Sequence, residues 1–233
     1  MNRSLEDIIK AEEEFSRYHD KLRNELNIVN WHFTVLKYIR ENQNNYLREL
    51  NQSPAFWGLT INAHLFSALT RLNNFFGKKE KEKHLHMYSF LDFVKNNLYI
   101  FSKETFERRL RIVNRYDELA ANHNCETTKE KVDTDVQKLS NLPISNLKAW
   151  RNKILSHIDK DSIAQNVDIT KQYPVKIKQI DEIINTLHDM LNEYLLAFDF
   201  STHSKDLTLE YGIQYILDAL RFKLQSKPFR PTP

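Results

Sequence analysis

The sequence predicts an all-α protein, and three observations lead to this prediction. Only 3 glycines and 6 prolines occur among the 233 residues, so tight turns are few. Leucine, isoleucine, lysine, glutamate and asparagine recur at helical spacing along the whole chain. Residues that typically cap helices precede several of these periodic segments. We therefore expect long helices and no extensive sheet.

The first two helices have the clearest starts. Ser4 heads a capping sequence, and the apolar stripe that follows extends toward Ile39, as one helix or two. Ser53 caps a second helix that has Pro54 at its first position, where a missing amide proton does no harm. This helix is expected to stop at Gly77.

The remaining helices follow from caps and breaks in the same way. Ser102, Thr127 or Thr128, and Ser145 are predicted caps, whereas Pro143 interrupts the chain. In chain order we expect helices over residues 87–101, 103–121, 128–142, 145–158, 174–195 and 207–224. Because there is no repeat, glycine-rich hinge or long linker, residues 1–233 are predicted to form a single helical domain.

The most informative segment is 147–159, which reads LKAWRNKILSHID. At about 100° per residue, Leu147, Leu155 and Ile158 share one apolar face, and Arg151 lies within it, about 40° from Leu147. Burying an unpaired guanidinium costs several kcal/mol, so Arg151 needs a partner or a cleft. His157 lies near the edge of the stripe. The sequence thus places an arginine and a histidine close to an apolar surface.

This segment resembles the Arg-x(4 to 6)-His motif of the HEPN superfamily. The fuller string WRNKILSHID, from Trp150 to Asp159, is most similar to the abortive-infection HEPN proteins of bacteria, the AbiU type. A second, weaker resemblance covers residues 68–72 through 87–91, and together the two span about half of the chain. Some members have a tyrosine two positions after the histidine, where this chain has Asp159.

The resemblance implies a fold, an activity and a set of site residues. The fold is an up-and-down helical bundle with a core over about residues 54–200 and extra N- and C-terminal helices. The activity is metal-independent RNA cleavage in a bacterial defence system of the abortive-infection or toxin-antitoxin type. Arg151, His157 and Asn152 are the expected catalytic residues, and Lys153, Trp150 and Ser156 the expected substrate contacts.

The same resemblance implies partners. Members usually place two motifs across a dimer cleft, so a homodimer with a composite site is expected, with an antitoxin or nucleotidyltransferase as a further partner. Such a nucleotidyltransferase adenylylates the tyrosine found in some members. Asp159 replaces that tyrosine here, which puts this form of control in doubt.

Net charge and composition limit the classes of function and location that remain. The net charge of +3 is lower than that of proteins that bind nucleic acid non-specifically over their whole surface, so any RNA contact must be local. The single cysteine, Cys125, excludes an intrachain disulfide, and no signal peptide or membrane span is expected. We therefore expect a cytoplasmic protein. No cofactor is expected, and His84 and His86 lack further spaced ligands, so no metal is expected either.

Other interpretations stay open. Arg151 and His157 could bind nucleotide, RNA or a partner protein without catalysis, or only join helices through carboxylates. A plain helical scaffold is a third alternative. Arg108, Arg111 and Arg115 share a helix face that could follow an RNA backbone, or form a solvated face paired with Glu104, Glu107, and Asp117 or Glu118.

Overall fold

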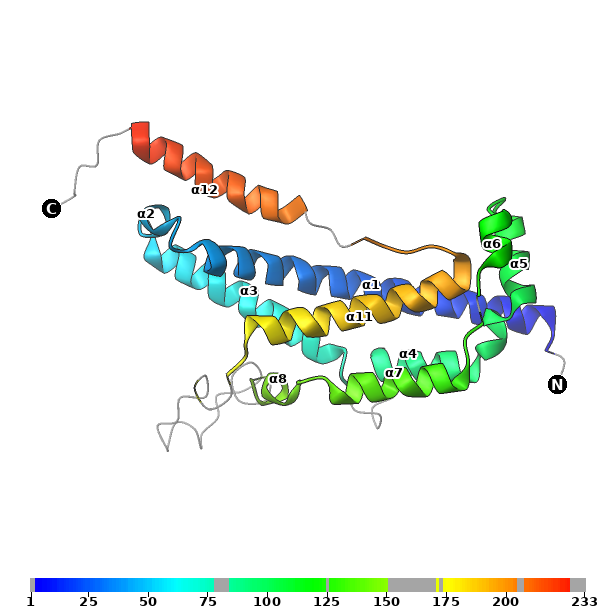
Figure 1. Cartoon of the computed structure of the whole chain (residues 1–233). Helices are drawn as coiled ribbons and strands as arrows, with labels where there is room; N and C mark the ends of the chain where they lie inside the picture. Colours follow the sequence, from blue (N-terminus) through cyan, green and yellow to red (C-terminus); the bar gives the residue numbers. More distant parts are fainter. Residues whose placement is uncertain are drawn as a thin grey trace. The chain divides into compact units, whose positions relative to one another are not determined.

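The computed structural model describes residues 3–77, 84–124, 126–150, 171, 174–204 and 208–226. Within these ranges every regular element is a helix and no strand occurs, which confirms the all-α prediction (Figure 1). None of the described helices is long and apolar enough to cross a membrane. The fold is thus set by how helices pack along their apolar stripes.

Contacts within the chain group into two compact units. The first unit comprises Met1–Leu26 and Leu72–Ser204, and the second comprises Asn27–Arg71 and Lys205–Pro233. Two long helices, α1 (Leu5–Asn42) and α3 (Pro54–Asn74), contribute residues to both units. The single-domain assignment stays a prediction.

Helix α1 answers the question that the sequence left open, because residues 5–42 form one continuous helix. Its start has the predicted cap: the Ser4 hydroxyl accepts a hydrogen bond from the Asp7 amide at 3.1 Å, and the Ser4 amide donates to the Asp7 carboxylate at 3.3 Å. This reciprocal pair satisfies two amides that the first turn of the helix leaves without a partner.

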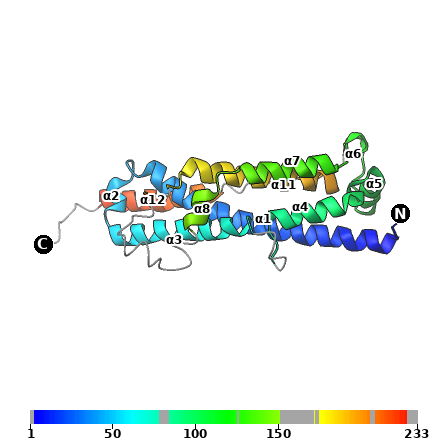
Figure 2. The ribbon, with the colours of Figure 1, turned by 90° about the horizontal axis from the view of Figure 1, so that it is seen from below.

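The first unit also contains the shorter helices of the middle of the chain. They are α4 (Met87–Asn96), η1 (Leu98–Phe101), α5 (Lys103–Ile112), α6 (Glu118–Asn122), α7 (Lys129–Asn141), α8 (Ser145–Trp150) and α11 (Ile177–Asp199). Helix α7 lies alongside α4 (Figure 2). As predicted, Ser102 caps α5 and Thr128 caps α7.

Two helix predictions in this region are wrong in their extent. Residues 87–101 form α4 followed by the separate 3-10 turn η1, and the helix predicted over 103–121 breaks after Ile112. Asn114 there takes a left-handed backbone with a φ of 54°, which asparagine tolerates better than most residues. Asp117 then caps α6, its carboxylate accepting the Ala120 amide at 2.9 Å.

An aromatic cluster forms the core of the first unit. The Phe15 ring of α1 lies 4.3 Å from the Phe198 ring of α11 and 5.3 Å from the Phe101 ring of η1, centre to centre. The Phe90 ring of α4 lies 5.6 Å from Phe15, also between ring centres. These edge and tilted contacts add to the free energy of burial, so the cluster fixes α1 against α4, η1 and α11.

The second unit combines the later part of α1 and most of α3 with α2 (Leu47–Leu50) and α12 (Thr208–Ser226). Its small core comprises the buried residues Ile39, Tyr46, Ile213 and Leu217. The Tyr46 hydroxyl donates to the Asp218 carboxylate at 2.7 Å and so satisfies its polar end. Helix α12 is thereby held by both apolar and polar contacts.

Candidate functional site

The predicted catalytic residues Arg151, Asn152 and His157, and the predicted contacts Lys153 and Ser156, lie outside the described residues. Trp150 is the last described residue before them, at the end of α8. The structure therefore describes the chain before the motif, up to Trp150, and the chain after it, from residue 174. The geometry of the motif side chains themselves stays a prediction.

Helix α8 presents one apolar face to the first unit. Ile144, Leu147 and Trp150 recur every three residues and are 7%, 2% and 7% exposed. The intervening Ser145 and Lys148 are exposed. The one-sided apolar stripe that the sequence predicts for this helix is thus present in its described part.

Two hydrogen bonds fix the chain around the motif. The buried carboxamide of Asn73, at the end of α3 that belongs to the first unit, donates to the Leu147 carbonyl at 3.1 Å. The Asn146 carboxamide donates to the Pro174 carbonyl at 2.7 Å. Asn146, directly before the motif segment, is therefore held next to Pro174, which lies 15 residues beyond the end of that segment. These two hydrogen bonds anchor the start of the motif segment in the first unit.

Trp150 was predicted to contact substrate, with base stacking as its use. With 7% of its surface exposed, the indole contributes mainly to the packing of α8. A base would reach only this small exposed part. Its role in substrate binding stays a prediction.

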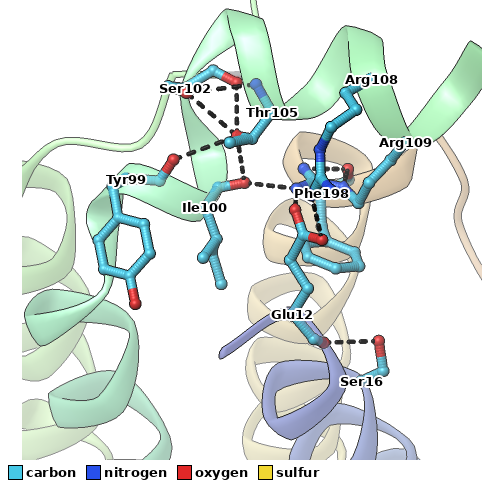
Figure 3. A network of polar contacts seen from close by, with 9 residues as sticks. All are labelled: Glu12, Ser16, Tyr99, Ile100, Ser102, Thr105, Arg108, Arg109 and Phe198. Atoms are coloured by element: carbon cyan, nitrogen blue, oxygen red, sulfur yellow. Dashed lines mark hydrogen bonds and ion pairs between the residues drawn. The ribbon is translucent and has the colours of Figure 1, made fainter. Parts of the chain in front are cut away.

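A charged network that the sequence analysis missed joins four elements of the first unit (Figure 3). The Glu12 carboxylate of α1 accepts hydrogen bonds from Arg108 Nη2 at 2.5 Å and from Arg109 Nη1 at 2.6 Å. Arg109 Nη1 also donates to the Ile100 carbonyl of η1 at 2.7 Å. Its Nε and Nη2 donate to the Phe198 carbonyl at 3.0 and 2.7 Å. One guanidinium thereby ties α5 to α1, η1 and the end of α11.

Burial explains why this network needs its full set of partners. The Arg109 side chain is 11% exposed, and its guanidinium lies 4.0 Å above the centre of the Phe198 ring. Burial lowers the pKa of Arg109, while the hydrogen bond and charge of Glu12 oppose that effect. Because the donors of Arg109 are engaged within the protein, this residue serves to hold helices together.

The three arginines of the predicted basic face also contact the protein itself. Arg108 pairs with Glu12, although the sequence analysis named Glu104 among its partners. Arg111 pairs with Glu107 at 3.1 Å as expected, and Arg115 Nη2 donates to the Phe200 carbonyl at 3.4 Å. Of the second interpretation, the pairing with Glu107 is confirmed, whereas Arg108 pairs with Glu12 and Arg115 bonds to a backbone carbonyl in place of the other predicted acids. A partner in the distant α1 leaves no signal in the local spacing.

His19 and His203, whose ring centres lie 6.0 Å apart, form a second polar cluster that the sequence analysis did not single out. The ring of His19 is 1% exposed, and its Nε2 lies 3.2 Å from the Leu191 carbonyl, so that nitrogen carries the proton and donates. The Asn192 carboxamide binds both the amide and the carbonyl of His203 at 2.9 Å. Burial lowers the pKa of His19 and of His203. Both imidazoles are therefore neutral near pH 7 and serve internal contacts.

No described group of three or more histidine, cysteine, aspartate or glutamate side chains is placed to hold a metal ion. His86, which the sequence analysis weighed as a ligand, has another task. Its Nδ1 accepts the Ser89 amide at 3.2 Å and so caps α4. That imidazole is 2% exposed.

Comparison with known protein families identifies the family of this chain. The family model HEPN_AbiU2, described as AbiU2, matches residues 12–222 of the chain. The match includes the helices of both units and the Arg151 to His157 segment. No curated protein and no solved structure matches.

Proposed function

Because the chain belongs to the HEPN family AbiU2, we propose that it is a metal-independent endoribonuclease of a bacterial abortive-infection or toxin-antitoxin type defence system, acting in the cytoplasm. The observation that carries this proposal is the Arg151-x5-His157 spacing within the matched residues. The hydrogen bonds at Asn146 and Leu147, where the segment begins, support it, because a catalytic segment needs a rigid base.

The proposed reaction needs a base and a cation. His157 takes the proton from a ribose 2′-hydroxyl, the resulting oxygen attacks the adjacent phosphorus, and the 5′-oxygen leaves as it takes up that proton from the imidazolium. The products are a 2′,3′-cyclic phosphate and a 5′-hydroxyl end. Arg151 binds the phosphate oxygens as negative charge builds on them, and Asn152 orients the phosphate by hydrogen bonding.

Helical geometry supports a second copy of the chain in this site. In the helix that the sequence predicts over residues 145–158, Arg151 and His157 would lie about 9 Å apart along the axis and about 120° around it, so one motif would not aim both side chains at one phosphate. A homodimer would supply the missing group from the partner. Helix α3 offers an apolar stripe for such pairing: Phe56, Leu59 and Phe66 are 58%, 72% and 39% exposed. With the exposed Ala63, their 3-4-3 spacing is typical of helices that pair.

The activity is tested by incubating the purified protein with total RNA in excess chelator. We expect cleavage that leaves cyclic phosphate ends, reduced by about two to three orders of magnitude in Arg151→Ala and lost in His157→Ala. His84→Ala is the matched control, because His84 is exposed and lies outside the motif. Equal cleavage by His157→Ala and His84→Ala, or cleavage that chelator abolishes, would contradict the proposal.

The dimer is tested by analytical ultracentrifugation beside the same RNA assay. Leu59→Lys should give a folded monomer that no longer cleaves, because a charge in the apolar seam opposes pairing. Asn62→Lys, on an exposed position of the same helix, should remain dimeric and active. A wild-type protein that cleaves RNA as a monomer would refute the composite site.

The second candidate is a HEPN module that binds nucleotide, RNA or a partner protein without catalysis. It is favoured if the wild-type protein binds RNA tightly and leaves it intact in the same assay. An antitoxin or nucleotidyltransferase is a proposed partner in either case. Control by adenylylation is not part of the proposal, because Asp159 stands where that modification needs a tyrosine.

A further inference from the structure

Two histidines of the second unit face each other between helices α1 and α3. His32 lies on α1 and His64 on α3, and their Nδ1 atoms are 3.0 Å apart. The ring centres are 5.1 Å apart, with an angle of 57° between the ring planes. The two residues are 32 positions apart in the sequence, so local spacing did not reveal them, and the sequence analysis expected no metal. Neither belongs to the motif segment.

The small core of the second unit holds the backbone around this pair. Val35, one turn after His32, and Ile61, one turn before His64, both pack against that core. Ligand groups keep a narrow geometry when the residues that support them are packed in this way. Both imidazoles are half-buried, so each remains partly accessible to solvent.

The distance between the two nitrogens suits a single metal ion. Zinc binds imidazole nitrogen at about 2.0 to 2.1 Å, so two such nitrogens lie about 3.3 to 3.4 Å apart at the tetrahedral angle and about 2.8 to 3.0 Å apart at a right angle. The observed 3.0 Å falls in the second range and within about 0.4 Å of the first. Each ring must turn to direct its lone pair at the ion, and the outer torsion of histidine is soft enough to permit this.

The chemistry of the pair also suits a metal ion. One Nδ1 can donate only if the other accepts, so at least one of the two carries a lone pair directed into the gap. With both rings neutral, metal binding moves the shared proton to the Nε2 of its own ring, and both Nδ1 atoms then bind the ion. Neutral imidazole is a preferred ligand of zinc, copper and nickel, whereas magnesium prefers oxygen.

Two features keep the expected affinity moderate. In the part of the chain that the structure describes, no third histidine, cysteine, aspartate or glutamate side chain joins the pair, so water would complete the coordination. Burial, the facing imidazole and the charge of Arg71 lower the pKa of His32. The same positive charge of Arg71 repels a metal cation. We therefore expect binding at submillimolar concentration of the ion.

We propose that His32 and His64 bind one divalent transition-metal ion, of the zinc or copper class, which links α1 to α3 within the second unit. The ion takes no part in RNA cleavage, because the pair shares no residue with the motif and the RNA assay contains excess chelator. Its effect is on stability: an ion that binds the folded chain and not the unfolded chain shifts the equilibrium toward the folded state.

The test is isothermal titration of the full, untagged chain with zinc chloride, after metal has been removed with chelator and dialysis. Even loss of a residue that hydrogen-bonds a ligand costs about 10- to 100-fold in metal affinity, so His32→Asn and His64→Asn should each weaken zinc binding at least about tenfold. Asparagine retains a hydrogen-bonding group near the place of Nδ1, so these variants should still fold. His84→Asn is the matched control, because His84 is exposed and lies outside the pair.

Urea unfolding provides a second measurement. Zinc should raise the urea midpoint of the wild-type protein and of His84→Asn, but not that of His64→Asn, and magnesium should raise none of them. The proposal is overturned if zinc does not bind saturably at submillimolar concentration, or if His64→Asn binds it like His84→Asn. His157→Ala should keep the zinc affinity, so failure of the nuclease and failure of the metal site are distinguishable.

Discussion

Replacing Gly77 with alanine should destabilise the protein, while the same replacement at Gly58 should stabilise it. Gly77 follows the end of α3, and an alanine Cβ there would lie 2.5 Å from His86 Cδ2 and 3.0 Å from His86 Cγ. Carbon atoms in favourable contact are about 3.5 to 4.0 Å apart, so the overlap is about 1 Å. A Cβ at Gly58, inside α3, meets nothing within 4 Å.

The magnitude follows from how firmly the imidazole is held. His86 is 2% exposed, its Nδ1 accepts the Ser89 amide at 3.2 Å, and its own amide donates to the Ser89 hydroxyl at 2.9 Å. The ring cannot retreat without losing the cap of α4, a loss of about 1 kcal/mol. Overpacking in a buried site adds about 1 to 3 kcal/mol. Gly77→Ala should therefore lower the free energy of unfolding by about 2 to 4 kcal/mol.

Urea unfolding followed by circular dichroism measures both effects. Gly58→Ala should raise the free energy of unfolding by about 0.5 to 1 kcal/mol, because alanine is the better residue within a helix. Adding His86→Ala to Gly77→Ala removes the obstructing ring, so the alanine at position 77 should then have little further effect. If Gly77→Ala is as stable as Gly58→Ala, the packing of His86 on Gly77 is not as described.

Two further predictions concern charge. Glu12→Gln should lower the free energy of unfolding by about 3 kcal/mol, because it leaves two guanidinium groups beside an uncharged partner. The control is Glu13→Gln at the exposed neighbouring position, which should change the free energy of urea unfolding by less than about 0.5 kcal/mol. Equal effects of the two substitutions would contradict a structural role for the network. Acid should also destabilise the fold, because burial lowers the pKa of His19 and His203 below the ordinary 6.5. Below pH 6.5 the unfolded chain therefore binds protons that the folded chain does not. The free energy of unfolding should decrease as the pH falls from 6.5 toward the lowered pKa values. Urea unfolding across this pH range measures the slope, which should be smaller in His19→Asn; a slope that this substitution leaves unchanged would remove His19 as a cause.

Helix starts were readable from the sequence because caps are local. Ser4, Ser102 and Thr128 each accept a backbone amide three residues ahead, and these contacts depend on little beyond neighbouring residues. Breaks inside apolar periodic stretches were not readable. Residues 103–121 keep a helical pattern, yet the chain turns at Asn114, and Phe200 packs against the small core of Phe106, Leu110 and Ala120 that lies there.

The sequence by itself determined the helical class, most helix starts and the family motif, because periodicity, caps and motif spacing lie within short stretches of chain. Only the tertiary structure decided which charged groups meet. Glu12 and Arg109 are far apart in the sequence, and so are Glu49 and Arg221, so their pairing depends on how helices pack. Packing also decided that Gly77 must have no side chain, since the ring that would meet it comes from His86, beyond the end of α3.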